Sequence, residues 1–223
     1  MIVHDGWRWW LNPAEAKEDE ECLGQGGELS VPTLLRAYKE GLFPWYNENQ
    51  PILWWSPNPR AIFNLDQFYV SRRTQRTIRS EKFTITVNQC FKEVMKQCGK
   101  RYEGTWITAA MLVAYGNLHE KGHAHSLETW FEGKLVGGVY GVSIGAAFFA
   151  ESMFYRVSDA SKVALTKLVD RLRDRGFLLL DTQVITNHTE SLGAIEIPRS
   201  TYLARLKEAI EVTDVTFIDP VYG

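Results

Sequence analysis

Residues 135–150 form an uncharged stretch of sixteen residues that contains four glycines. A membrane-spanning helix needs about 20 consecutive apolar residues, so this stretch is too short to be one. Strands that are covered on both faces of a sheet have nearly continuous apolar sequences. The stretch therefore predicts buried strands at the centre of a sheet, entered through a hairpin turn at Glu132-Gly133-Lys134.

Helix and strand patterns alternate on either side of this stretch. Helical spacing, capping residues and terminal glycines predict four helices, at 32–39, at 71–79, from Thr108 to Gly122, and from Ser158 or Asp159 to Gly176. Apolar runs predict five strands, at 83–87, 127–131, 135–143, 146–151 and 177–184. This order predicts an α/β fold with a mixed sheet and at least one crossover.

Residues 41–60 are rich in proline and aromatic side chains, and proline at this density prevents a regular helix. We interpret this segment as an ordered loop that ends a small N-terminal domain. The sequence thus predicts two domains, a small one over residues 1–60 and a larger one over residues 61–223.

The charge of the chain is small overall but unevenly distributed. The formal net charge is −2, which does not by itself indicate a nucleic-acid-binding protein. Residues 60–101, however, hold ten basic and three acidic residues. Arg72, Arg76 and Arg79 share one helix face, with Arg73 and Lys82 beside it, and guanidinium groups suit phosphate. The pattern predicts a nucleic-acid backbone site, although a solvated helix face has the same pattern.

The three cysteines contain no C-x-x-C pair, and the N-terminus has no apolar core of a signal peptide. Both features are typical of a protein of a reducing compartment, and we expect a cytoplasmic protein.

Polar residues follow two of the predicted buried strands. Asp181 and Gln183 end the strand that begins at residue 177, and Glu151 ends the strand that begins at residue 146. Such strand ends often build sites in α/β sheets, and a partly desolvated carboxylate becomes more basic. For both carboxylates the alternative is a purely structural role, at a strand end that leads into a turn or reaches solvent.

Two other motifs have weaker support. Gly141-Val142-Ser143-Ile144-Gly145 matches G-x-S-x-G, with Asp181 and His188 following in hydrolase order, but the next residues predict a strand where a hydrolase needs a helix. His119, His123 and His125 lack the spacing of a zinc site, so no metal is expected.

Specific strings in the chain closely resemble the leucyl/phenylalanyl-tRNA–protein transferases over about residues 22–205. Trp54-Trp55-Ser56-Pro57 and Glu151-Ser152-Met153-Phe154 are rare strings. The others, in chain order, are Gly26-Gly27-Glu28-Leu29-Ser30, Gly41-Leu42-Phe43-Pro44-Trp45-Tyr46, Glu103-Gly104-Thr105-Trp106-Ile107-Thr108, Gly122-His123-Ala124-His125-Ser126, Gly137-Gly138-Val139-Tyr140-Gly141, Ala160-Ser161-Lys162, Asp181-Thr182-Gln183 and Ser191-Leu192-Gly193-Ala194.

The resemblance implies a GNAT-like acyltransferase domain preceded by a small N-terminal domain. It implies an enzyme that transfers Leu, Phe or less efficiently Met from aminoacyl-tRNA to proteins with N-terminal Lys or Arg, which marks them for N-end rule degradation. No cofactor, metal or membrane is implied. The segment 155–160 also lacks the glycines that hold the pyrophosphate of coenzyme A in acetyltransferases of this fold.

The resemblance also implies roles for individual residues. Asp181 is the charged partner of the attacking amine, Gln183 positions that amine, and Glu151 lies near the aminoacyl ester or amine. Two further sets bind the donor. The carried amino acid and terminal adenosine meet Tyr38, Trp45, Trp106, Tyr115, Phe148, Met153 and Leu168, and the acceptor stem meets Arg72, Arg73, Arg76, Arg79 and Lys82.

Three alternatives stay open at this point. Asp181 either acts as a base or only positions the amine while a ribose hydroxyl of the tRNA carries the proton. A serine hydrolase acting through Ser143, or a noncatalytic RNA-binding module, would account for parts of the pattern.

Overall fold

The structure, a computed structural model, describes residues 9–100 and 105–218. Glu103 and Gly104, which belong to one of the motifs above, lie outside the described residues. No helix in the described ranges is long and apolar enough to cross a membrane.

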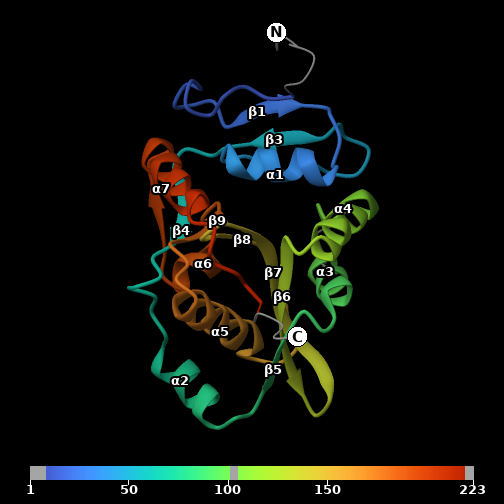
Figure 1. The fold of residues 1–223 in the computed structure, drawn as a ribbon. Coiled ribbons are helices and arrows are strands. Elements are labelled where there is room, and N and C mark those ends of the chain that lie inside the picture. The colour runs from blue at the N-terminus through green and yellow to red at the C-terminus, as the bar shows by residue number, and fades with distance from the viewer. Residues whose placement is uncertain (1–8, 101–104, 219–223) are drawn as a thin grey trace.

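The N-terminal unit is a three-stranded antiparallel sheet covered by one helix, seen at the top of Figure 1. The strands run in the order β1-β3-β2. Its elements are β1 (Cys22–Gln25), α1 (Val31–Lys39), β2 (Phe43–Pro44) and β3 (Leu53–Trp55). The expected loop over residues 41–60 is therefore wrong in part. Proline excludes helix there but tolerates the very short strands β2 and β3.

The larger unit is a seven-stranded mixed sheet in the order β10-β4-β9-β8-β7-β6-β5. Only the β8–β9 pair is parallel, and α5 (Ala160–Asp174) is its crossover. The strands are β4 (Arg60–Phe63), β5 (Thr84–Val87), β6 (Ala124–Phe131), β7 (Lys134–Ile144), β8 (Ala147–Tyr155), β9 (Leu179–Gln183) and β10 (Ala194–Ile197). The predicted mixed sheet with a crossover is confirmed.

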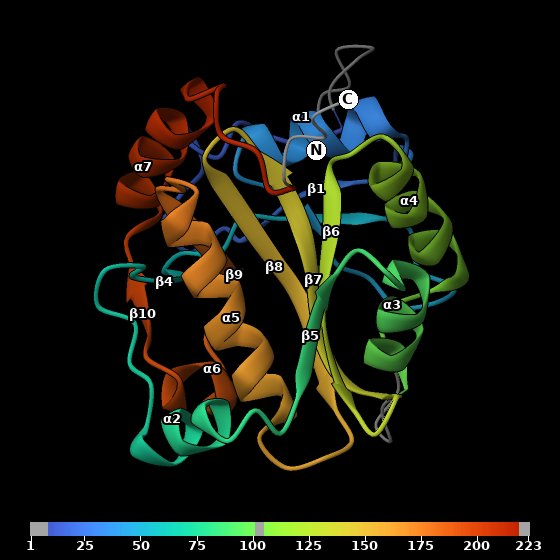
Figure 2. The same cartoon turned by 60° about the horizontal axis from the view of Figure 1, so that its bottom comes forward.

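Helices cover both faces of this sheet (Figure 2). Helix α5 packs on β6, β7 and β8 from one side. From the other side α3 packs on the same three strands and α4 packs on β6. The remaining helices are α2 (Arg72–Arg79), α3 (Phe91–Gly99), α4 (Ala109–Glu120), α6 (Asn187–Ser191) and α7 (Arg199–Glu211). The predicted helices at 71–79 and after Thr108 are confirmed, and Thr108 does cap α4 by accepting from the Met111 amide.

The G-x-S-x-G motif forms no nucleophile elbow. Ser143 lies inside β7, and β8 begins four residues beyond it at Ala147. The motif serves packing, because a Cβ at Gly141 would lie 2.2 Å from the Phe149 carbonyl oxygen. The hydrolase alternative is therefore wrong.

Arg199 fastens α7 to the N-terminal unit. Its side chain is almost fully buried and donates to four backbone carbonyl oxygens at 2.6–3.0 Å, those of Ala16, Lys17, Glu20 and Ser56. No carboxylate takes part in this clamp.

We expect Arg199→Ala to lower the free energy of unfolding by about 1–3 kcal/mol, because the buried Ser56 carbonyl loses its donor and keeps the cost of desolvation, and three part-buried carbonyls lose a hydrogen bond each. Urea unfolding measures the change. Arg205→Ala, an exposed arginine on the same helix, is the control and should stay within about 0.5 kcal/mol of the parent. Equal effects of the two substitutions would contradict the clamp.

Candidate active site

A cavity of about 510 Å³ opens where β8 and β9 stop pairing. The two parallel strands pair only as far as Phe149 and Asp181. Beyond that point their carboxyl ends diverge, and ligands in α/β sheets commonly bind in such a gap. The cavity is lined by β8, the end of β9, α6, the β2 region and Trp106; its residues are Phe43, Pro44, Trp45, Trp106, Val139, Ala150, Glu151, Ser152, Met153, Thr182, Gln183, Val184, Thr186, His188 and Thr189.

Both strands are irregular beside the cavity. On β8, Ala150 pairs with Gly141 and Ser152 pairs with Tyr140, which leaves Glu151 as an extra residue in a β-bulge. A bulge turns a side chain away from the regular alternation, and here it accompanies a carboxylate in the cavity wall. On β9, Gln183 has a φ of +62°, in the left-handed region that a side chain other than glycine seldom adopts.

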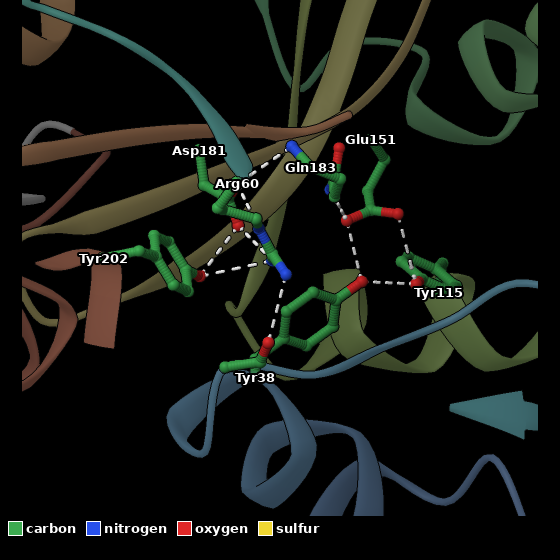
Figure 3. A network of polar contacts seen from close by, with 8 residues as sticks. Tyr38, Arg60, Tyr115, Glu151, Asp181, Gln183 and Tyr202 are labelled. Carbon is green, nitrogen blue, oxygen red and sulfur yellow. Dashed lines mark hydrogen bonds and ion pairs between the residues drawn. The ribbon is translucent and has the colours of Figure 1, made fainter. Parts of the chain in front are cut away.

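The Glu151 carboxylate is held by three donors from separate elements (Figure 3). Its Oε1 accepts from the Tyr38 hydroxyl at 2.7 Å and from the Gln183 amide nitrogen at 2.9 Å. Its Oε2 has only a long contact of 3.4 Å from the Tyr115 hydroxyl. The second oxygen therefore keeps acceptor capacity for a cation in the cavity.

Burial of Glu151 raises the pKa of its carboxyl group to about 8, and the Asp181 charge adds to the effect while the two tyrosine hydroxyls oppose it. The Glu151 carboxyl group is therefore largely uncharged at neutral pH, and a cation bound beside it would draw the proton off.

The raised pKa predicts a pH-dependent difference between Glu151→Gln and the parent protein. Between pH 4.5 and about 8 the folded protein keeps a proton on Glu151 that the unfolded chain has lost, so this group's contribution to stability falls as pH rises. Glutamine is neutral throughout. From pH 5 to pH 8, the free energy of unfolding of the variant should rise relative to that of the parent by about 2 kcal/mol or more, since one pKa unit corresponds to about 1.4 kcal/mol. Urea unfolding at the two pH values tests this, and a constant difference would contradict it.

Asp181 lies behind the cavity, in a buried cluster that Figure 3 shows on the left. Its carboxylate pairs with both the Nε and an Nη of Arg60, at 2.9 and 2.6 Å. It also accepts from the Tyr202 hydroxyl and from the backbone N–H of Gln183, each at 2.9 Å. Both Arg60 and Asp181 have no exposed side-chain surface.

Arg60 links this cluster to the N-terminal unit. Its guanidinium donates to the Gly41 carbonyl at 3.1 Å and lies between the rings of Phe43 and Tyr202. Burial disfavours the charged guanidinium, but the Asp181 charge outweighs this effect and raises the pKa of Arg60, so the guanidinium stays charged. Arg60 is one of the ten basic residues in 60–101, and no spacing in the sequence predicts its pairing with Asp181. A single arginine at the start of the apolar strand Ala61-Ile62-Phe63 was the available signal.

The structure brings together some of the residues predicted to form the site and not others. Glu151, Gln183, Trp45, Trp106 and Met153 all line the cavity. The other five are fully or almost fully buried and are not among the residues that line it: Tyr38, Tyr115, Phe148, Leu168 and Asp181.

Tyr38 and Tyr115 touch the site through their hydroxyl groups. The Tyr38 ring packs on Phe149 with centroids 4.9 Å apart and has no exposed surface, so no adenine ring can stack on it in this structure. Trp45, which is 42% exposed at the cavity, does offer such a surface.

Phe148 and Leu168 belong to the core between the sheet and α5. The Phe148 ring stacks on Phe217, with centroids 5.0 Å apart. This pair was expected to contact the carried amino acid. Neither residue lines the cavity, but Val139 and Ala150 of the cavity lining belong to the same apolar cluster, and Met153 packs against it.

The predicted basic surface lies on α2. Arg72, Arg73, Arg76 and Arg79 of this helix are exposed, and so is Lys82, three residues after its end. Arg73 pairs with Asp159 at 3.0 Å and also bonds Ser158. A small cavity is lined jointly by Ser71, the N-cap of α2, by Thr74 of α2 and by Ser191 at the end of α6. The basic helix therefore adjoins the helix that forms one wall of the large cavity (Figure 2).

The histidines considered for zinc have other surroundings. His119 stacks on Phe91, and the ring of His125 stacks on Phe217. Within the part of the chain that the structure describes, no three His, Cys, Asp or Glu side chains form a group suited to a metal ion.

Comparison with protein families gives two matches. A family model described as leucyl/phenylalanyl-tRNA protein transferase matches residues 62–207, and the model of that family's N-terminal domain matches residues 27–58.

Curated relatives carry the same description. The leucyl/phenylalanyl-tRNA–protein transferase of Hydrogenovibrio crunogenus is 49% identical over 195 residues, covering 86% of this chain and 76% of the relative. That of Syntrophobacter fumaroxidans is 46% identical over 202 residues, covering 89% of this chain and 86% of the relative.

Among solved structures, a ribosomal-protein-alanine N-acetyltransferase from Brucella melitensis matches with a TM-score of 0.33 and 15% identity, over 43% of this chain and 74% of that one. L-PGS from Bacillus licheniformis matches with a TM-score of 0.42 and 13% identity, over 71% and 52%.

Proposed function

The chain belongs to the leucyl/phenylalanyl-tRNA–protein transferase family and is an aminoacyltransferase, and from this premise we propose what it transfers and how. The donor is Leu-, Phe- or, less efficiently, Met-tRNA. The acceptor is a protein with an N-terminal Lys or Arg, and the product is marked for N-end rule degradation.

One observation carries the proposal, namely the placement of the Glu151 carboxylate in the wall of an otherwise largely apolar cavity. Val139, Met153 and Phe43 offer apolar surface to an unbranched or aromatic side chain. The open Oε2 of Glu151 suits the α-ammonium group of the same amino acid. Trp45 and Trp106 offer ring faces to the terminal adenosine, and base–aromatic stacking contributes about 1–3 kcal/mol per base.

The reaction is aminolysis of an ester that is already activated. The incoming α-amine attacks the carbonyl carbon, and the ribose oxygen leaves. Glu151 and Gln183 orient the carried amino acid, and orientation of this kind contributes much of the rate in reactions between bound partners.

Asp181 acts in this proposal as a positioning residue. Its four hydrogen bonds leave no acceptor pointing at the cavity, and one of them fixes the backbone N–H of Gln183. That bond supports the left-handed backbone from which the Gln183 amide reaches Glu151.

The basic residues of α2 would hold the acceptor stem by its phosphates, which gives affinity without base readout. Arg72, Arg76, Arg79 and Lys82 would each neutralise about one phosphate, while Arg73 is already paired with Asp159. Contacts to phosphates depend on the charge and shape of the RNA and not on its bases. Different tRNAs that carry leucine should therefore bind with similar affinity.

We expect the logarithm of the binding constant for Leu-tRNA to fall with the logarithm of salt concentration with a slope of about −3, from four contacts of roughly 0.7–0.9 each. Between 50 and 200 mM salt this weakens binding about 60-fold. Arg76→Ala should reduce the slope by about 1, and Arg205→Ala on α7 should leave it unchanged. A slope near zero in the parent protein, measured by filter binding, would contradict the assignment of α2.

The function itself is tested by mixing labelled Leu-tRNA with a peptide that begins with arginine. We expect a peptide that carries leucine on its N-terminus, and none with uncharged tRNA or with a peptide that begins with alanine. Absence of the conjugate, with donor and acceptor both bound, would leave an RNA-binding module as the better account.

A further inference from the structure

The small cavity between α2 and α6, here called the α2–α6 recess, has no role in the function proposed above. Its lining includes Tyr69 and Ser71 just before α2, Lys162 in the first turn of α5 and Ser191 at the end of α6. Helix α6 also contributes Thr189 to the wall of the large cavity. This short helix therefore borders both the α2–α6 recess and the large cavity.

Tyr69 presents an aromatic ring to solvent at the α2–α6 recess. Its neighbour Phe68 turns inward and packs edge-on against Phe63, with ring centroids 5.5 Å apart, whereas Tyr69 is 64% exposed. Tyr69 lies beside the end of α6, because a Cβ built on Gly193 would be only 3.8 Å from the Tyr69 Cβ. An exposed aromatic ring on an anchored backbone is a surface on which a nucleobase can stack.

Lys162 supplies the one charged group in the described lining of the α2–α6 recess. Its side chain is partly buried, and none of the ion pairs among the described residues includes it. Burial lowers the pKa of His188 on α6, and the charge of Lys162 adds to this effect, so the ammonium group lies close to α6. A partly buried cation without a counter-ion suits an anionic group of a ligand.

The size of the α2–α6 recess separates what enters it from what lies over it. The recess holds about 40 Å³, room for about one or two groups of the size of a water molecule. A phosphate oxygen fits there, whereas a nucleobase must lie outside, over the ring of Tyr69. The arrangement therefore suits a single nucleotide that is held by its phosphate and its base.

We propose that the α2–α6 recess binds one of the unpaired nucleotides that precede the terminal adenosine of the donor tRNA, with the phosphate at Lys162 and the base on Tyr69. This inference rests on the function proposed above and deepens it. It gives the acceptor end a path from the large cavity, over α6, to the basic residues of α2 (Figure 2).

Two features favour RNA over a protein partner at Tyr69. The ring lies among cations, with Lys162 in the same recess and Arg72 at the start of α2. Stacking on an aromatic ring also tolerates any base, and every tRNA ends in the same unpaired CCA sequence, so the contact would serve all donors alike.

The test compares two donors, Leu-tRNA and leucine esterified to adenosine alone, with an arginine-initial peptide as the acceptor. Tyr69→Ala should lower kcat/KM for Leu-tRNA about 5- to 100-fold, which corresponds to the roughly 1–3 kcal/mol of one base–aromatic stack. The loss should lie in KM and not in kcat, because stacking holds the ground state and the transition state equally. The short donor ends before Tyr69, so the variant should use it as the parent does, which also reports that the variant is folded.

Three further variants sharpen this comparison. Tyr69→Phe keeps the ring and should stay within about twofold of the parent, whereas Tyr69→Leu keeps only apolar surface and should resemble Tyr69→Ala. Lys162→Met should make the salt slope of Leu-tRNA binding shallower by about 0.7, the effect of one phosphate contact on a single strand. Leu178→Ala is the matched control, since Leu178 is 60% exposed just before β9, at the opposite end of that strand from the large cavity.

A kcat/KM for Leu-tRNA within about twofold of the parent in both Tyr69→Ala and Tyr69→Leu would overturn the proposal. An equal loss with both donors would also overturn it, because the substitution would then act on the large cavity. An unchanged salt slope in Lys162→Met would overturn the placement of the phosphate. Failure of the proposed function has a different signature, since the parent protein itself would then form no conjugate with either donor.

Discussion

Replacing Arg60 with methionine is expected to lower the free energy of unfolding by about 3–5 kcal/mol, the largest change in stability that we anticipate for a single residue. The substitution leaves the Asp181 carboxylate buried without its counter-ion, and both side chains have no exposed surface. It also removes the donor to Gly41 and thus one link between the N-terminal unit and the sheet.

A double-mutant cycle separates the ion pair from simple packing. Asp181→Asn keeps the shape of the side chain and removes its charge. The double variant Arg60→Met with Asp181→Asn should therefore lose less free energy of unfolding than the sum of the two single losses, by about 1 kcal/mol or more. Urea unfolding of the three variants gives this coupling. Additive effects would show that Arg60 and Asp181 act independently, and Arg205→Met provides the surface control.

Glu151→Gln is expected to reduce kcat/KM for transfer from Leu-tRNA roughly 10²-fold or more. The variant keeps the shape of the side chain but leaves the α-ammonium of the carried amino acid without a counter-ion in a cavity wall. Losing one partner of a desolvated charge pair costs about 2–5 kcal/mol, and each 1.4 kcal/mol is tenfold.

Initial rates at several concentrations of Leu-tRNA measure the effect. Glu190→Gln removes an exposed carboxylate from α6 and serves as the control at parent activity. A loss smaller than about threefold in Glu151→Gln would mean that this carboxylate does not hold the donor.

Local patterns predicted most of the sheet and several helices. Alternation, caps and glycines marked β6, β7, α4 and α5, because each of these elements is specified by residues close together in the chain. The short strands β1, β2 and β3 escaped prediction, since two to four residues give no measurable period and their pairing depends on segments up to about thirty residues away.

The sequence predicts several of the residues of the site but not how their side chains are arranged. Glu151 and Gln183 were found because each ends an apolar strand, and both line the cavity. The ion pair of Asp181 joins residues 121 positions apart, and the bulge that directs Glu151 depends on its register with β7. Pairings of this kind are set by the tertiary fold, and no spacing in the sequence reports them.

The central claim is that the gap between β8 and β9 receives the carried amino acid and its terminal nucleotide together. The most direct test is an experimentally determined structure of the protein with adenosine that carries leucine through a stable amide at the 3′ position. We predict the leucine ammonium within hydrogen-bond distance of Glu151, its side chain against Val139 and Met153, and the adenine on Trp45 or Trp106. A ligand bound elsewhere, or bound in the cavity with its ammonium away from Glu151, would contradict the account.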